Sequence, residues 1–268
     1  MPASRSPSRR AEPAARSHSY WPIVLIGLAA VLAVIIAVLP ASIASHFLPP
    51  SVHAEDFSGS IWHGSAGKLS VAGRDAGALE WRLHPAALLG MRAAADVHWV
   101  KGGFVVDAGL DMDRHGYAAR NVKGGGPIED LRDVGVAAGW RGTALIDFNE
   151  IKGDFTRPSS AAGILRIANL ASAQVAEGTD LGSYEVQLAQ GAVAADGTVN
   201  AQLVDTGGPL ELQAQIRYAP AARTGTLTGT LKERPDASPE LRNQLQNLAQ
   251  LHGRDAQGRI PVDFEVAL

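Results

Sequence analysis

Beyond residue 50 the chain alternates apolar and polar side chains with a period of two, and this pattern restricts its fold more than any other feature. At 210–218, leucine, alanine, isoleucine and tyrosine alternate with glutamate, glutamine and arginine. The same alternation recurs at 184–188, 199–203 and 260–268. Successive side chains of a β-strand point to opposite faces, so each run predicts a strand with one apolar and one solvated face. Because parallel sheets are buried on both faces, the runs favour an antiparallel sheet.

Glycine-rich turns separate these runs. The chain has 29 glycines among 268 residues, which exceeds the usual share of about 7%. Short clusters that contain glycine predict tight turns between strands. We therefore expect a mainly β domain, built as a curved sheet, a sandwich or a partly open barrel, with 157–160 as a candidate junction between two sheet segments, 52–158 and 159–268. The predicted turns are Gly102-Gly103, Gly124-Gly125-Gly126, Asp196-Gly197 and Gly207-Gly208.

Two helical segments interrupt the strands. A short C-terminal helix is predicted over 238–252, because Ser238 is a favourable N-cap, Pro239 suits the first helical position and Gly253 suits a C-terminal cap. Leucines recur along it at helical spacing, which is most simply a seam packed on the sheet; a partner-contact helix is the alternative. One short helical turn is predicted over 84–90. The leucines of the seam are Leu241, Leu245, Leu248 and Leu251.

An uninterrupted apolar run lies near the N-terminus. Residues 21–39 contain no charged or strongly polar side chain. A helix of this length, at about 1.5 Å per residue, nearly spans a hydrocarbon layer of about 30 Å. Four arginines precede the run, and no lysine or arginine follows it until Lys68. By the positive-inside rule, the tail is then cytoplasmic and the body is delivered across the membrane.

The chain is therefore expected to be a single-pass protein of the inner membrane. Its parts would be a cytoplasmic tail at 1–20, a transmembrane signal anchor at 21–40 and a periplasmic β-rich domain at 41–268. A cleavable signal peptide is the alternative, because residues 42–44 could form a small-residue cleavage site. Against it, the apolar run is longer than the roughly 7–15 residues of a typical signal-peptide core.

Charge and cysteine content exclude several classes of function. The chain has 24 Lys+Arg against 27 Asp+Glu, and four of the arginines lie in 1–20, so the remaining body is acidic. An acidic body lacks the clustered cations that bind phosphates, which excludes nucleic acid as a partner. The sequence contains no cysteine, which excludes disulfides, cysteine-ligated metals and thiol nucleophiles.

One group of residues could in principle carry chemistry. Asp111, Asp113 and His115 offer two carboxylates and an imidazole, which could hold a divalent metal. We favour a solvated strand face that runs into a turn at Gly116, because a metal site usually needs a further ligand and a supporting shell. The sequence contains no HExxH, phosphate-loop or nucleophile-elbow motif. We therefore predict no catalytic residue, no metal and no cofactor, and a protein that is not an enzyme.

Three stretches resemble a known family. SGSIWHGSAGKLSVAG is similar to the G-T-x-W-x-G-x-A stretch of type II secretion system protein N, the general secretion pathway N component. GALEWRLHPAALLG is similar to that family's L-G-x-L-x-W-x-L-x-P-x-x-L-L stretch, although Ala76 replaces a common leucine. The strand, helix, polar turn and final strand at 225–268 resemble the family's C-terminal end. The matching motif residues are Gly59, Trp62, Gly64 and Ala66, then Gly77, Leu79, Trp81, Leu83, Pro85, Leu88 and Leu89.

This resemblance implies an accessory inner-membrane component of the machine that exports folded proteins from the periplasm to the exterior. The implied partners are the other inner-membrane components of the type II secretion system, and the outer-membrane secretin is a further candidate. The residues also suggest structural roles of their own. Trp62 and Trp81 are suited to locking two strands together, the glycines to turns or close strand approach, and Pro85 to ending the strand of Trp81.

A lipid-handling protein is the rival hypothesis. An N-terminal anchor followed by a curved antiparallel sheet also resembles the start of AsmA-like envelope proteins, which shield acyl chains in an apolar groove. Low charge and period-two faces suit a groove as well as a core. The body is short, so its own packing uses much of the apolar face, which favours the secretion role and leaves lipid as an alternative ligand.

Overall fold

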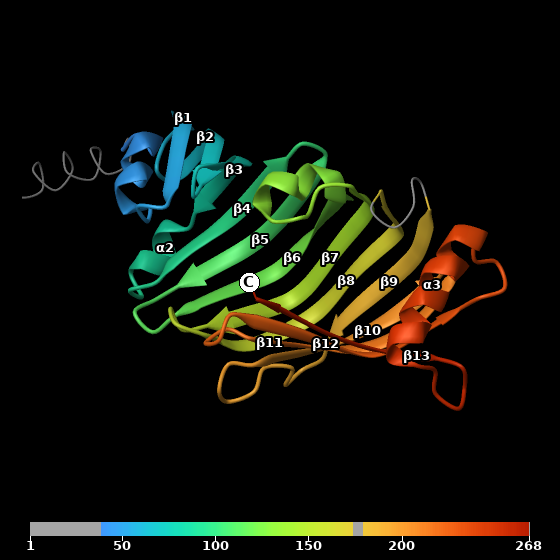
Figure 1. Ribbon diagram of the computed structural model, residues 1–268. Helices are drawn as coiled ribbons and strands as arrows, with labels where there is room; N and C mark the ends of the chain where they lie inside the picture. Colours follow the sequence, from blue (N-terminus) through green and yellow to red (C-terminus); the bar gives the residue numbers. More distant parts are fainter. Residues whose placement is uncertain (1–38, 174–178, 268) are drawn as a thin grey trace, which may run out of the picture. The chain divides into compact units, whose positions relative to one another are not determined.

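Residues 39–173 and 179–267 are described by a computed structural model, in which the part that begins at Pro40 forms one compact unit. Strands dominate this unit, and short helices lie between them (Figure 1). The strands are β1 (Val52–Gly59), β2 (His63–Val71), β3 (Arg74–Leu83), β4 (Ala93–Lys101), β5 (Phe104–Met112), β6 (Tyr117–Pro127), β7 (Trp140–Gly153), β8 (Pro158–Ser172), β9 (Asp180–Leu188), β10 (Val199–Gly207), β11 (Leu210–Ala219), β12 (Thr224–Glu233) and β13 (Ile260–Ala267). The helices are the 3-10 helices η1 (Ala41–Phe47) and η2 (Ile128–Val134) and the α-helices α2 (Pro85–Leu88) and α3 (Pro239–His252).

The described strands form one sheet, in which each strand pairs with its neighbours in the sequence. Every pairing is antiparallel. The sheet is open, with β1 and β13 as its edges. Figure 1 shows that it bends along its strand order, so that β11 to β13 run at a different angle from β4 to β9, as expected when the twist between neighbouring strands accumulates. The mainly β, antiparallel prediction is confirmed, and the curved open sheet is the form adopted.

One face of this sheet, the apolar face, carries an unbroken row of apolar residues and glycines from edge to edge. Residues that pair directly across neighbouring strands point to the same face, and one such row crosses the whole sheet through apolar side chains and glycines alone. The opposite face carries charges, such as the ion pair of His98 and Asp107 at 2.7 Å. The apolar row is Phe57, Ala66, Leu79, Trp99, Val106, Gly124, Ile146, Leu165, Val186, Leu203, Ala214, Gly229 and Val262.

Two helices pack on the apolar face. Ile128 of η2 is buried with Phe104 of β5 in a cluster that the residues of the apolar row on β4, β5, β7 and β8 also contact. Leu241 and Leu245 of α3 are buried against Ile260 of β13 in a second cluster. The core of the domain therefore lies between one face of the sheet and these two helices.

Both predicted helices form where the sequence places them. The side chain of Ser238 caps α3 by accepting the backbone N–H of Leu241 at 3.2 Å, and Pro239 occupies the first turn. Gly253 follows α3 with a φ of 76°, a backbone conformation that suits glycine. The short helical turn is α2, with its proline in the first turn.

The glycine triplet at 124–126 does not form a turn, so that prediction is wrong. The triplet lies within β6, between β5 and β7. A Cβ on Gly124 would lie 2.1 Å from the carbonyl oxygen of Val105, and one on Gly125 would lie 2.4 Å from that of Ala144. The glycines allow the neighbouring backbones to approach closely, which is a packing role and not a turn.

The sheet continues across 157–160 without a boundary. β7 ends at Gly153 and β8 begins at Pro158, within this stretch, and the two strands pair with each other along most of their lengths. The segments 52–158 and 159–268 thus contribute strands to one sheet.

The predicted tail at 1–20 and almost all of the predicted anchor at 21–40 lie outside the described residues. Among the helices that are described, none combines the length and the apolar character needed to cross a membrane.

Replacing Leu245 with alanine should destabilise the domain, because Leu245 is 5% exposed and its loss leaves a cavity between α3 and the sheet. The expected loss of unfolding free energy is about 2–5 kcal/mol. Leu251→Ala is the matched control, because Leu251 lies on the same helix and is 81% exposed. Urea unfolding of both variants tests this difference, and equal stability losses would contradict the packing described for α3.

Candidate interaction surfaces

The motif residues with family resemblance meet at the corner of the sheet formed by β1, β2 and β3. Trp81 on β3 pairs directly with Gly64 on β2. The indole Nε1 of Trp81 donates to the carbonyl oxygen of Ile61 at 2.8 Å. Its ring centroid lies 6.4 Å from that of Phe57, and the two ring planes meet at 73°. This edge-on contact and the satisfied N–H join the three strands through one side chain.

Two glycines at this corner occupy places where a side chain would not fit. A Cβ on Gly64 would lie 2.7 Å from Cζ2 of Trp81 and 2.9 Å from the Cβ of Ala41. Gly77 has a φ of 85°, and a Cβ there would lie 2.1 Å from the carbonyl oxygen of Val100. Gly64 therefore makes room for the tryptophan ring, and Gly77 lets β3 pass close to β4.

The motif residues divide into a packed group and an exposed group. β3 ends at Leu83, whose N–H donates to the carbonyl oxygen of Trp62 at 2.8 Å. Pro85 then begins α2, which buries none of its residues. The buried or half-buried group is Trp62, Gly64, Ala66, Gly77, Leu79, Trp81 and Leu83, and the exposed group is Gly59, Pro85, Leu88 and Leu89.

The four leucines of the α3 seam do not share one environment. Leu241 and Leu245 are buried, and Leu248 is partly buried against the same cluster. Leu251 projects to solvent. Most of the seam therefore serves packing within the domain, and Leu251 is the member of the four that a partner could reach.

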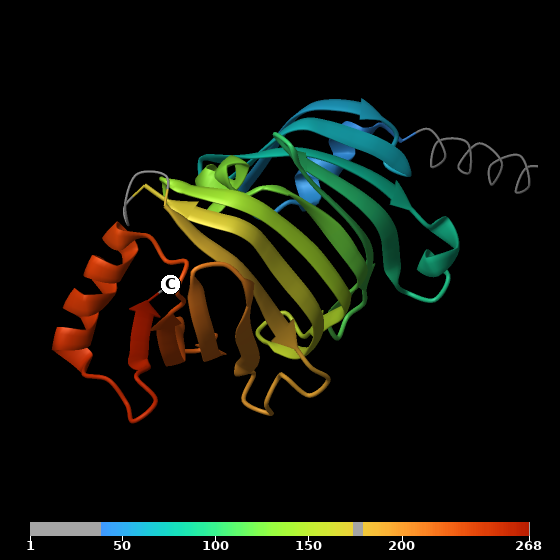
Figure 2. The ribbon, with the colours of Figure 1, turned by 90° about the vertical axis from the view of Figure 1, so that its right-hand side faces the viewer.

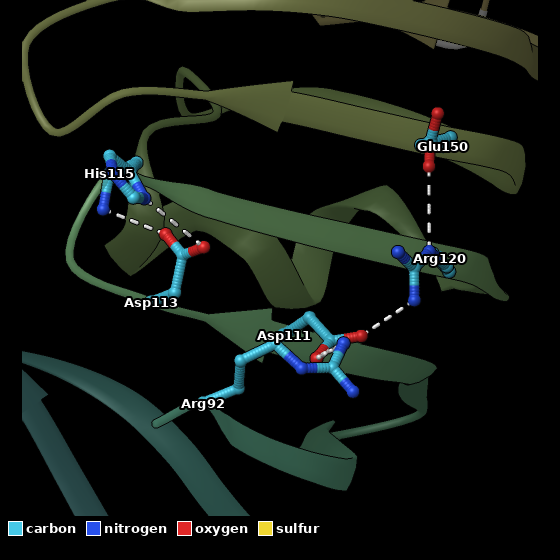
Figure 3. Close-up of polar contacts among 6 residues, drawn as sticks. All are labelled: Arg92, Asp111, Asp113, His115, Arg120 and Glu150. Atoms are coloured by element: carbon cyan, nitrogen blue, oxygen red, sulfur yellow. Dashed lines mark hydrogen bonds and ion pairs between the residues drawn. The ribbon is translucent and has the colours of Figure 1, made fainter. Parts of the chain in front are cut away.

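A ladder of ion pairs crosses the polar face near the ends of β5, β6 and β7 (Figure 3). Asp111 lies 3.4 Å from Arg92 and 2.6 Å from Arg120. Arg120 also lies 3.4 Å from Glu150, which in turn lies 2.7 Å from Lys152. The bond with Lys152, followed by the contact with Arg120, lowers the pKa of Glu150. Each charge in the ladder is thus paired with a charge of opposite sign.

Asp111, Asp113 and His115, which were considered as a metal site, belong to two separate sets of contacts. The carboxylate of Asp113 accepts the backbone N–H of His115 at 2.7 Å and of Gly116 at 3.1 Å. These bonds close the β5–β6 turn and lower the pKa of Asp113. Asp111 belongs to the ion-pair ladder instead (Figure 3). Within the described residues, no three His, Asp or Glu side chains are placed to hold a metal ion together.

A polar cluster near α3 was not predicted from the sequence. The carboxylate of Asp205, 8% exposed, pairs with Arg234 and accepts the backbone N–H of Leu212 at 3.1 Å. Arg234 also donates to the carbonyl oxygen of Gly208 at 2.9 Å. Burial raises the pKa of Tyr184 to about 12, with the charge of Asp205 as the second cause. Asp205 lies on β10, whereas Arg234 directly follows β12, so the alternation pattern contains no signal that pairs them.

The two edge strands of the sheet, β1 and β13, have different surroundings. Near β1, Pro40 forms an isolated β-bridge with Ser60. On β13, Pro261 supplies no backbone N–H, and the side chains of Asp263 and Glu265 are exposed. In the described part of the chain, neither carboxylate forms an ion pair. Charges on an edge strand discourage unspecific pairing with other strands.

By its fold, the chain is an open antiparallel β-sheet protein in which η2 and α3 pack on one face. The family model described as Type II secretion system (T2SS), protein N matches residues 50–263. Because the match covers most of the chain, the chain belongs to the type II secretion system protein N family, as its motifs suggested. In the same comparisons, no curated protein and no solved structure matched the chain.

Gly64→Ala should destabilise the corner, because its Cβ would lie 2.6 Å from the carbonyl oxygen of Ser60 and 2.7 Å from the Trp81 ring. The expected loss is about 1–3 kcal/mol, as for other overpacked sites. Gly90→Ala is the control, since its Cβ would lie 3.4 Å from the nearest atom, the carbonyl oxygen of Ala87. Thermal unfolding compares the two, and an unchanged melting temperature for Gly64→Ala would refute the close approach.

Arg234→Met should destabilise the domain by leaving the buried carboxylate of Asp205 without its cation. Losing one partner of a fully buried pair costs about 3–5 kcal/mol. We expect a smaller cost here, because the Arg234 side chain is 33% exposed and solvent screens the pair. Arg254→Met removes a pair with Glu233 whose carboxylate is more exposed, at 29%, and should cost at most about 1 kcal/mol. If urea unfolding ranks the variants in the reverse order, the role assigned to Asp205 is wrong.

Proposed function

We propose that this protein is an accessory inner-membrane component of the type II secretion system, which acts by binding other proteins during export of folded proteins from the periplasm. The family match over residues 50–263 carries this proposal. Its mechanism is association without turnover chemistry. The partners are the other inner-membrane components of the system, with the outer-membrane secretin as a further candidate.

The proposed location follows from the N-terminal sequence. Residues 21–39 form an apolar run long enough for a membrane anchor, and the arginines before it favour a cytoplasmic tail. The β-rich domain then lies in the periplasm, where exported proteins and the periplasmic parts of partners are accessible.

The β13 edge is the proposed docking surface. An edge strand can accept a further strand, whose backbone groups supply affinity while its side chains supply specificity. Asp263 and Glu265 are exposed there, and opposite charges across strands favour pairing. A partner strand with lysine or arginine on its solvated face would therefore fit this edge best. None of the comparisons supports the alternative of a lipid-handling protein.

A single cysteine at Phe264 tests this edge, because the natural chain has no cysteine and Phe264 on β13 is 50% exposed. A thiol-linked photocrosslinker at Phe264→Cys should capture inner-membrane secretion components or the secretin in cells that are secreting. Leu145→Cys is the control, because Leu145 is 52% exposed but lies on the central strand β7.

Charge reversal gives the matching loss of function. The double change Asp263→Lys and Glu265→Lys should reduce partner capture at Phe264→Cys and leave exported protein in the periplasm. Reversal of Asp147, an exposed carboxylate on β7, should leave both unchanged. Normal export and capture in the double variant would contradict docking at the β13 edge.

A further inference from the structure

The connection between β3 and β4 exposes apolar side chains that the domain does not use. Leu88 is 49% exposed, Leu89 is 91% exposed and Met91 is 84% exposed. α2, within this connection, buries none of its residues. Figure 2 shows α2 in the connection at the ends of β3 and β4, where it projects past the end of the sheet. We refer to residues 84–92 as the α2 tip.

The composition of the α2 tip favours contact with a membrane interface. Residues 84–92 contain no acidic side chain, and Arg92 closes the segment. The contact between Arg92 and Asp111, at 3.4 Å, ties the tip to the end of β5. Arg92, Met112 and Asp154 line one pocket, so the β3–β4, β5–β6 and β7–β8 connections lie close together. Phe155, which follows Asp154 in the β7–β8 connection, is also exposed. Exposed leucine, methionine and phenylalanine beside arginine are typical of segments that lie in a membrane interface.

The α2 tip also lies beside the point at which the chain enters the domain. Pro40, the first residue of the compact unit, forms a β-bridge with Ser60 in the β1–β2 connection. In the same connection, the carbonyl oxygen of Trp62 accepts the N–H of Leu83 at 2.8 Å. α2 begins two residues after Leu83, at Pro85. The apolar run at 21–39 ends one residue before Pro40, so the chain that leaves a bilayer holding this run enters the domain at the corner from which α2 projects.

We propose that the α2 tip binds the surface of the bilayer that holds residues 21–39. Leu88, Leu89 and Met91 enter the interface, and Arg92 remains at the level of the lipid phosphates. The contact gives the anchor a second attachment and restricts how the domain is oriented on the membrane. This inference rests on the membrane anchor of the proposed function and adds a surface that faces the lipid.

Single cysteines carrying an environment-sensitive fluorophore test the contact. Full-length chain is reconstituted in vesicles of phosphatidylethanolamine and phosphatidylglycerol, with the label at Leu89→Cys or at Leu251→Cys. Both leucines are highly exposed, and Leu251 lies in the β12–β13 connection, at the opposite end of the strands. Label at position 89 should emit at shorter wavelength and be quenched by nitroxide-labelled lipids, whereas label at position 251 should stay in water and unquenched.

Vesicle flotation separates the two proposals. If the chain floats with the vesicles while position 89 remains unquenched, the anchor stands and the α2 contact is overturned. If the chain does not float, the anchor and the contact both fail. If position 89 is shielded only after secretion components are added, the tip binds protein, and the bilayer contact is also overturned.

Discussion

The structure depends on the alternation of side chains along the thirteen strands described, which pair so that one apolar row crosses the sheet. Because the side-chain period is two, a slip of a single residue would turn the apolar side chains of a strand to the solvated face. The unbroken apolar row from Phe57 to Val262 therefore requires every pairing in the sheet to be correct. η2 and α3 can cover this face because all the strands present it on the same side.

Local patterns predicted the features whose causes lie within a few residues. Alternation located β9, β10, β11 and β13, and the Ser238 cap located α3. The sequence did not distinguish a curved sheet from a sandwich or a partly open barrel, because closure depends on whether the distant strands β1 and β13 meet. The glycines at 124–126 were wrongly predicted to form a turn, because glycine permits both turns and close strand approach. The ion pair of Asp205 with Arg234 depends on sheet register, which alternation alone does not reveal.

The motif residues serve two purposes, and this division links the fold to the proposed function. Trp81 over Gly64 closes the corner where the chain enters the domain. Leu88 and Leu89 continue from that corner into the exposed α2 tip. The family assignment places such a domain in the type II secretion system. In the proposed function, the exposed α2 tip beside this corner would position the domain at the membrane and leave the β13 edge for protein partners.

The most direct test of this account is purification of the full-length chain from native membranes after crosslinking in cells, with protein and lipid quantified together by mass spectrometry. The account predicts recovery of inner-membrane secretion components or the secretin, with lipid only in the amounts expected for a membrane protein. A tightly bound phospholipid or lipopolysaccharide in equal ratio to the chain, without any secretion partner, would contradict it. The apolar face would then be a lipid groove, and the family assignment would describe ancestry more than present function.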